Sequence, residues 1–149
     1  MDPLKRPTHR LPRWQRRTLT LSGALLLATG IAWLPVHYGF GAGAGELPHP
    51  VEAWMLRLHG AAAFVALFCA GVLAAAHIPQ GWRLSGHRRW RTQRWTGLWL
   101  CALTALLAVS GWLLYYCAPE TVRPMLGGVH AALGVSMAGL LLGHRRGAG

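Results

Sequence analysis

Four long apolar runs separated by polar segments dominate the chain, at about residues 18–36, 51–78, 95–117 and 124–143. A helix needs about 20 apolar residues to cross a hydrocarbon layer of roughly 30 Å, so each run is long enough to span a membrane. The pattern predicts an all-α integral membrane protein, a four-helix bundle over residues 18–144. Residues 1–17 and 145–149 are expected to be polar tails.

The segments between the runs set the order of the helices. A glycine-rich loop is expected at residues 35–50, after a first run that ends at Val36, and Pro79 with Gly81 should end the second helix. Only residues 118–123 separate the third and fourth runs, so these helices should be antiparallel neighbours. The second and fourth helices then run in the same direction.

Charge orients the predicted bundle. The formal net charge is +11, and thirteen of the fifteen Lys and Arg residues lie in three blocks, at residues 5–17, 83–94 and 145–146. In the predicted topology all three blocks fall on one side of the membrane. Loops rich in Lys and Arg are typically on the cytoplasmic side, so this side is expected to be cytoplasmic. Both termini are therefore expected to be cytoplasmic. The blocks favour membrane lipid, and not nucleic acid, as the partner of the basic side chains.

Two features of the sequence allow other interpretations. A basic leader before an apolar run also fits a signal peptide, but the length of the first run and Trp33 within it favour a retained span. The three cysteines, Cys69, Cys101 and Cys117, lack CxxC spacing and are interpreted as small buried apolar residues.

Histidines recur on one face of two helices. His130 and His144 are fourteen residues apart in the fourth run, which at about 100° per residue leaves them about 40° apart around the helix. His59 and His77 are eighteen residues apart in the second run, which is a whole number of helical turns. Because the two helices are parallel, His59 should lie at the level of His130, and His77 near the level of His144.

Two facing imidazoles are the ligand set that six-coordinate haem iron needs, with the macrocycle between helices. Gly97 and Gly111 in the third run repeat the fourteen-residue spacing of the histidines and would let the backbone approach a large ring. Gly23 and Gly30 in the first run are seven residues apart and lie on nearly one face, which is a weaker form of the same pattern. Arg123, seven residues before His130, could pair with haem propionates.

Other roles are open for these residues. Intramembrane histidines also join helices by hydrogen bonds, and glycines allow close helix packing. A haem-free small membrane subunit or assembly factor would use them in that way, and a metal-ion transporter would use histidines as transient ligands. His37, His49 and His87 are interpreted as solvated loop residues.

The helix pattern and histidine positions resemble the small membrane cytochromes b. These include the gamma subunits of formate dehydrogenase, the cytochrome b subunits of nickel-iron hydrogenase and uncharacterised relatives. The resemblance covers about residues 11–144 and is a spacing pattern without a long motif. The core of respiratory cytochrome b is also similar, since its parallel second and fourth helices supply all four haem ligands.

The resemblance implies His59, His130 and His144 as axial ligands of haem iron. The fourth ligand would be His77 by similarity to respiratory cytochrome b. By similarity to formate dehydrogenase it would come from the first helix, for which this chain offers only His9, in the tail.

The function implied is electron transfer across a bacterial-type inner membrane through one or two haems b, with two favoured. A redox partner protein or quinone would exchange electrons with them. The residues suggest no catalytic nucleophile or acid–base pair, so any enzymatic activity would be limited to quinone chemistry.

Overall fold

The computed structural model describes residues 12–84 and 91–146, and the side chains of residues 12–76, 78–79 and 94–145. These residues form four α-helices and one short 3₁₀ turn, with no strand among them. The elements are α1 (Arg13–Phe40), η1 (Ala42–Ala44), α2 (Pro50–Leu84), α3 (Arg91–Tyr116) and α4 (Arg123–Arg146). The prediction of an all-α protein with four long helices is confirmed.

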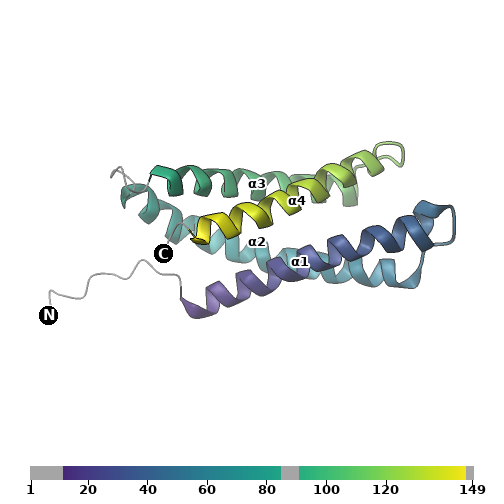
Figure 1. Cartoon of the computed structure of the whole chain (residues 1–149), viewed down its shortest axis with the longest axis horizontal. Helices are drawn as coiled ribbons and strands as arrows, with labels where there is room; N and C mark the ends of the chain where they lie inside the picture. The colour runs from purple at the N-terminus through teal and green to yellow at the C-terminus, as the bar shows by residue number, and fades with distance from the viewer. Residues whose placement is uncertain (1–11, 85–90, 147–149) are drawn as a thin grey trace, which may run out of the picture.

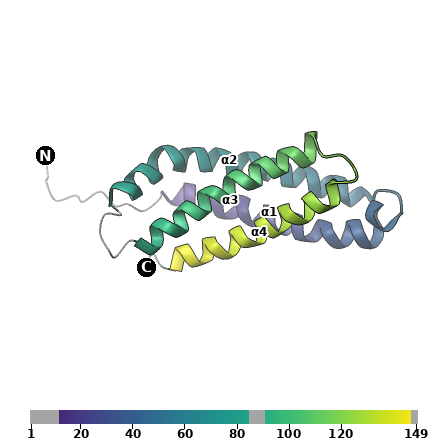
Figure 2. The ribbon, with the colours of Figure 1, turned by 90° about the horizontal axis from the view of Figure 1, so that it is seen from above.

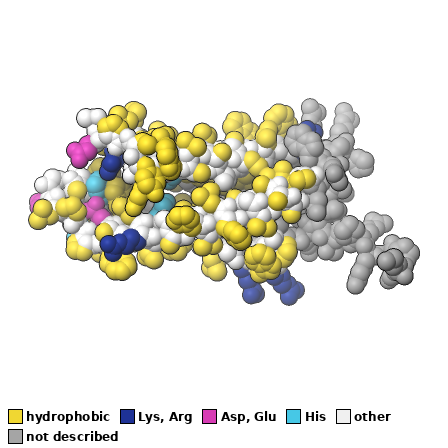
Figure 3. Space-filling view, turned by 180° about the vertical axis from the view of Figure 1, so that it is seen from behind, with side chains coloured by type: hydrophobic (Ala, Val, Ile, Leu, Met, Phe, Trp, Pro, Cys, Tyr) yellow, Lys and Arg dark blue, Asp and Glu magenta, His cyan; other side chains and the backbone are white. Residues whose placement is uncertain are grey.

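All four helices are long and apolar enough to cross a membrane. The candidate spans are Arg13–Ala44, Pro50–Ala76, Arg94–Tyr116 and Arg123–Arg145. Their large apolar side chains point outward: Phe64 is 80% exposed and Leu21 70%. In Figure 3 such side chains cover the length of the bundle, and charged groups lie near its ends. This surface suits lipid, and the chain is a multi-pass membrane protein.

The helices form two antiparallel hairpins. In Figures 1 and 2, α1 lies beside α2 and α3 lies beside α4, and the start of α1 and the end of α4 lie at the same end of the bundle. Contacts within each hairpin outnumber those of α1 with α4 and of α2 with α3. We call the end that holds η1 and the α3–α4 turn the loop end, and the opposite end the basic end. Because α2 and α4 run in the same direction, residues at corresponding depths can face each other between the hairpins.

Small residues let α1 and α2 approach closely. Ser22 and Thr29 of α1 are buried, as are Ala62 and Cys69 of α2. Cys101 and Cys117 are exposed, so the interpretation of all three cysteines as buried is wrong for these two. Side chains of α3 point outward toward lipid as often as inward, and the sequence pattern does not separate these directions.

Two helices extend past the predicted ends of their apolar runs, Val36 and Ile78. Pro35 lies inside α1, which continues to Phe40, and Pro79 lies inside α2, which continues to Leu84. In lipid each backbone N–H or C=O without a partner costs several kcal/mol, so a helix tends to continue past one missing donor. The predicted loop at residues 35–50 is correspondingly shorter.

Candidate functional site

His59 of α2 and His130 of α4 face each other between the two hairpins. Their ring centroids are 6.2 Å apart and the ring planes are inclined by 62°. Both side chains are partly buried. The structure therefore brings together the pair that the parallel helices predicted.

Each of these rings is held by a hydroxyl group from the other helix of its own hairpin. Thr29 Oγ1 of α1 lies 2.9 Å from Nδ1 of His59. Ser110 Oγ of α3 lies 2.8 Å from Nδ1 of His130. Both Thr29 and Ser110 are buried, so water competes little for these bonds.

The hydroxyl groups also suggest an assignment for the ring protons. Thr29 Oγ1 lies 2.7 Å from the Leu25 carbonyl oxygen, and Ser110 Oγ lies 3.3 Å from Leu107 O, so each hydroxyl can donate within its own helix. With that donation each hydroxyl accepts from its histidine, an assignment that puts the ring proton on Nδ1 of His59 and of His130. The Nε2 atoms of both rings are left with a lone pair, and no hydrogen bond occupies them in the described part of the chain.

A glycine follows each hydroxyl residue and gives the imidazole its space. A Cβ atom at Gly111 would lie 3.3 Å from Cε1 of His130, and one at Gly30 would lie 3.5 Å from Cε1 of His59. Gly111 was expected to make room for a cofactor next to a histidine, and it lies against the histidine itself. Its role in the structure is to let the ring sit close to α3.

His144 repeats this arrangement one level toward the basic end. Its Nδ1 lies 2.6 Å from Thr96 Oγ1, and a Cβ atom at Gly97 would lie 3.9 Å from its Cε1. The α3–α4 hairpin thus has two Ser/Thr–Gly dipeptides fourteen residues apart, each opposite a histidine. The α1–α2 hairpin has one such unit, Thr29–Gly30 opposite His59.

One member of the predicted inner pair, His77, has no described side chain. It belongs to α2, and His9 lies outside the described residues altogether. The pairing of His144 with His77 therefore stays a prediction.

Two polar groups lie between the histidine pair and the loop end, Arg123 of α4 and Trp33 of α1. Arg123 is exposed, and its Nη2 donates to Ala118 O at 3.0 Å, which ties the start of α4 to the α3–α4 turn. Trp33 is one turn beyond Thr29 in α1, and its Nε1 is buried with no hydrogen-bond partner among the described residues. A buried N–H of this kind is suited to an acceptor that is not part of the chain.

His37 is not simply solvated, contrary to the sequence interpretation, whereas the side chain of His49 is exposed outside the helices as expected. His37 Nδ1 lies 2.7 Å from Oε2 of the buried Glu52, and its ring stacks on Trp33 with centroids 4.1 Å apart. The backbone N–H of His49 donates to Glu52 Oε1 at 2.9 Å, which caps the start of α2. These contacts join the loop ends of α1 and α2. His87 lies outside the described residues.

The site has too few protein ligands for a bare metal ion. The described residues contain no group of three or more His, Cys, Asp or Glu side chains placed to hold one. Protein-bound zinc typically has three or four protein ligands. Two imidazoles with free lone pairs suit an iron that brings four equatorial nitrogens of its own.

The spacing between the rings also fits an axially ligated iron. Two metal–nitrogen bonds of about 2 Å on one axis, with roughly 1 Å from each nitrogen to its ring centre, separate the centres by about 6 Å. The observed separation is 6.2 Å. The donor chemistry and the spacing of His59 and His130 therefore fit haem.

Sequence reasoning missed the three hydroxyl residues, Thr29, Ser110 and Thr96. Each directly precedes a glycine that had been noted for its spacing. A Ser/Thr–Gly dipeptide repeated at the spacing of the histidines was the signal that could have identified them. The class defined by fold and site is a multi-pass helical membrane protein with a histidine pair between two hairpins. No protein-family model, curated protein or solved structure matches the chain.

Proposed function

We propose that the protein is a membrane b-type cytochrome that binds haem b between His59 and His130. The observation that carries the proposal is the geometry of the pair: two imidazoles from different hairpins have ring centroids 6.2 Å apart, and each is held through Nδ1 by a buried hydroxyl group. With Nδ1 donating to the hydroxyl, each Nε2 keeps a lone pair that can bind haem iron.

Residues around the pair would hold the rest of the cofactor. Gly30 and Gly111 let both histidine rings sit against α1 and α3, which leaves the space between the hairpins to the macrocycle. The buried N–H of Trp33 suits a propionate oxygen. Arg123 remains a second candidate for that role, although its Nη2 already donates to a backbone carbonyl.

A bound haem would supply a one-electron redox centre. The protein would hold both axial imidazoles neutral, orient them through Thr29 and Ser110, and keep water out. We place a second haem between His144 and His77, because Thr96 and Gly97 hold His144 as Ser110 and Gly111 hold His130. Two haems at different depths would carry electrons across the bilayer, and the protein would serve as the membrane subunit of a respiratory oxidoreductase.

The partners follow from this role. A redox protein on one side and a quinone or second protein on the other would exchange electrons with the haems. We place both termini in the cytoplasm of a bacterial-type cell, because the described basic residues Arg13, Arg16, Arg17 and Arg145 lie at the end where α1 starts and α4 ends.

One observation favours a second candidate, a haem-free membrane subunit or assembly factor. All three described intramembrane histidines, His59, His130 and His144, hydrogen-bond to a neighbouring helix, as purely structural histidines do. In that role, however, nothing would require the rings of His59 and His130 to lie close together between the two hairpins.

A pyridine haemochrome assay on the purified full chain separates the two candidates. We expect about two haems b per chain and a reduced-minus-oxidised alpha band. His130→Ala should remove the outer haem and His144→Ala the inner one, so each variant should fall to about one haem, while the control His49→Ala should keep both. Colourless wild-type protein would refute the cytochrome. One haem in the wild type that survives His144→Ala would refute the inner pair alone.

A further inference from the structure

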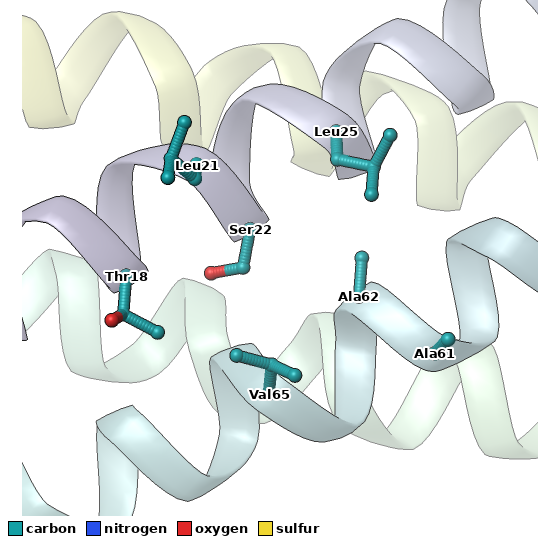
Figure 4. Close-up of a pocket in the computed structure, with 7 residues that line it drawn as sticks. All are labelled: Thr18, Leu21, Ser22, Leu25, Ala61, Ala62 and Val65. Atoms are coloured by element: carbon teal, nitrogen blue, oxygen red, sulfur yellow. The ribbon is translucent and has the colours of Figure 1, made fainter.

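A groove runs between α1 and α2 and opens on the surface of the bundle. Its volume is about 340 Å³. Figure 4 shows that α1 contributes Thr18, Leu21, Ser22 and Leu25 and that α2 contributes Ala61, Ala62 and Val65. Leu21, Leu25 and Val65 are 70%, 41% and 43% exposed, so the groove faces the surrounding lipid.

The lining leaves nothing for a hydrophilic ligand to bind. The only polar side chains are Thr18 and Ser22. The Thr18 hydroxyl donates to Trp14 O at 2.9 Å, and that of Ser22 donates to Leu19 O at 3.3 Å. Since both protons are used within α1, the groove accepts an apolar chain.

Arginines continue one wall of the groove toward the basic end. Arg13, Arg17, Leu21 and Leu25 follow each other at intervals of four residues, so they form one ridge along α1. Arg13 and Arg17 are exposed, and Trp14 beside them is 56% exposed, as expected for an anchor at the membrane–water interface. The ridge is thus cationic at the interface and apolar within the hydrocarbon layer.

Among the described residues the arginines have no acidic partner nearby. The described acidic residues, Glu46, Glu52 and Glu120, lie at or beside the loop end, at the opposite end of the bundle. Arginine side chains near a helix start extend toward the headgroup region, where they can pair with phosphate. Two unpaired cations directly above an apolar groove complement a ligand with an anionic head and a hydrocarbon chain.

We propose that this groove is a binding site for one anionic phospholipid. One acyl chain lies along Leu21, Leu25 and Val65, and the phosphate pairs with Arg13 and Arg17. The proposal does not require haem, since none of the groove-lining residues hydrogen-bonds to His59 or His130. It assigns the α1–α2 face a specific lipid, whereas other apolar faces of the bundle contact lipid without selection.

Native mass spectrometry of the delipidated full chain tests the site. The protein is titrated with palmitoyl-oleoyl phosphatidylglycerol and, separately, with phosphatidylcholine carrying the same chains. We expect one phosphatidylglycerol to bind at least tenfold more tightly than phosphatidylcholine. R13Q/R17Q should weaken phosphatidylglycerol binding about thirtyfold, since each surface cation adds about fivefold. Phosphatidylcholine binding should weaken much less, because the choline ammonium already offsets the charge of its phosphate.

Two further variants distinguish the groove from general charge. Ala61→Leu adds bulk to the exposed lining and should weaken both lipids, whereas Ala105→Leu on an exposed position of α3 should weaken neither. Arg16→Gln removes one charge from a different ridge of α1 and should have less than a third of the effect of Arg17→Gln. Equal effects of Arg16→Gln and Arg17→Gln, equal binding of the two lipids, or no effect of Ala61→Leu would overturn the proposal. Unchanged circular dichroism and elution volume show that each variant is folded.

Discussion

Individual hydroxyl groups decide what the two central histidines can bind. Thr29 and Ser110 each donate to a carbonyl of their own helix and accept from a histidine. A helix has few side chains that can do both, because the bond to the carbonyl of the preceding turn requires a short hydroxyl side chain. Two residues that look like ordinary small polar members of membrane helices therefore set the protonation of His59 and His130.

Thr29→Val tests this role while keeping the shape of the side chain. The Nδ1 proton of His59 loses its acceptor, so the imidazole becomes a weaker electron donor and its orientation is less restricted. We expect haem binding about tenfold weaker or worse and a reduction potential above that of the wild type. Haem titration followed by optical redox titration measures both quantities.

The matched variant is Thr29→Ser, which keeps the hydroxyl. It should restore both affinity and potential, and Ser136→Ala, which removes an exposed hydroxyl bonded only within α4, should change neither. A Thr29→Val protein with wild-type affinity and potential would show that the hydroxyl only joins helices.

At the scale of elements, the α3–α4 hairpin presents its histidines through close helix approach. The approach is tighter at Gly111, where a Cβ would lie 3.3 Å from His130, than at Gly97, where it would lie 3.9 Å from His144. At Gly23 a Cβ would meet nothing within 4 Å. One added methyl group would therefore be most crowded at Gly111, less crowded at Gly97 and free at Gly23.

Alanine substitutions should follow that series. Gly111→Ala forces the His130 ring to move by a few tenths of an ångström, which in a packed interior costs about 1–3 kcal/mol. We expect it to lower the outer haem content and to change the alpha band, while Gly97→Ala has a smaller effect and Gly23→Ala none. Haem-to-protein ratios of the three variants, purified alike, give the order. A loss at Gly23 as large as that at Gly111 would count against the close-approach role.

The sequence predicts the elements well because lipid makes length and apolarity decisive. It does not predict helix ends, since Pro35 and Pro79 stay inside helices that lipid stabilises. The facing of His59 and His130 follows from helix periodicity and parallel direction alone. The partners of the histidines do not, because which hydroxyl of α1 or α3 lies opposite a ring depends on how the helices rotate and slide when they pack. The capping contacts of His37 and His49 were missed for the same reason.

At the scale of the whole molecule, the polar groups are divided between the two ends. The described acidic residues and the His37–Glu52 pair lie near the loop end, and Arg13, Arg16, Arg17 and Arg145 lie at the other. Arg145 Nη2 also donates to Thr20 Oγ1 at 2.8 Å, which joins the two hairpins at the basic end. This division gives the bundle a definite direction in the membrane, with the basic end proposed to be cytoplasmic.

The native cysteines offer a direct test of that direction. Cys117 is exposed next to the α3–α4 turn at the loop end, whereas Cys69 and Cys101 lie well inside the candidate spans. Thiols react as thiolates, which form poorly in hydrocarbon, so a membrane-impermeant maleimide should modify Cys117 alone. In intact spheroplasts we expect rapid labelling of wild-type Cys117 and no labelling of Cys117→Ser. In inverted vesicles neither protein should be labelled, and Cys117 of the wild type should react only after detergent is added. Labelling of Cys117 in inverted vesicles only would place the loop end in the cytoplasm. In that case the haem held by His59 and His130 would be the one nearer the cytoplasm. Its proposed ligands would stay the same.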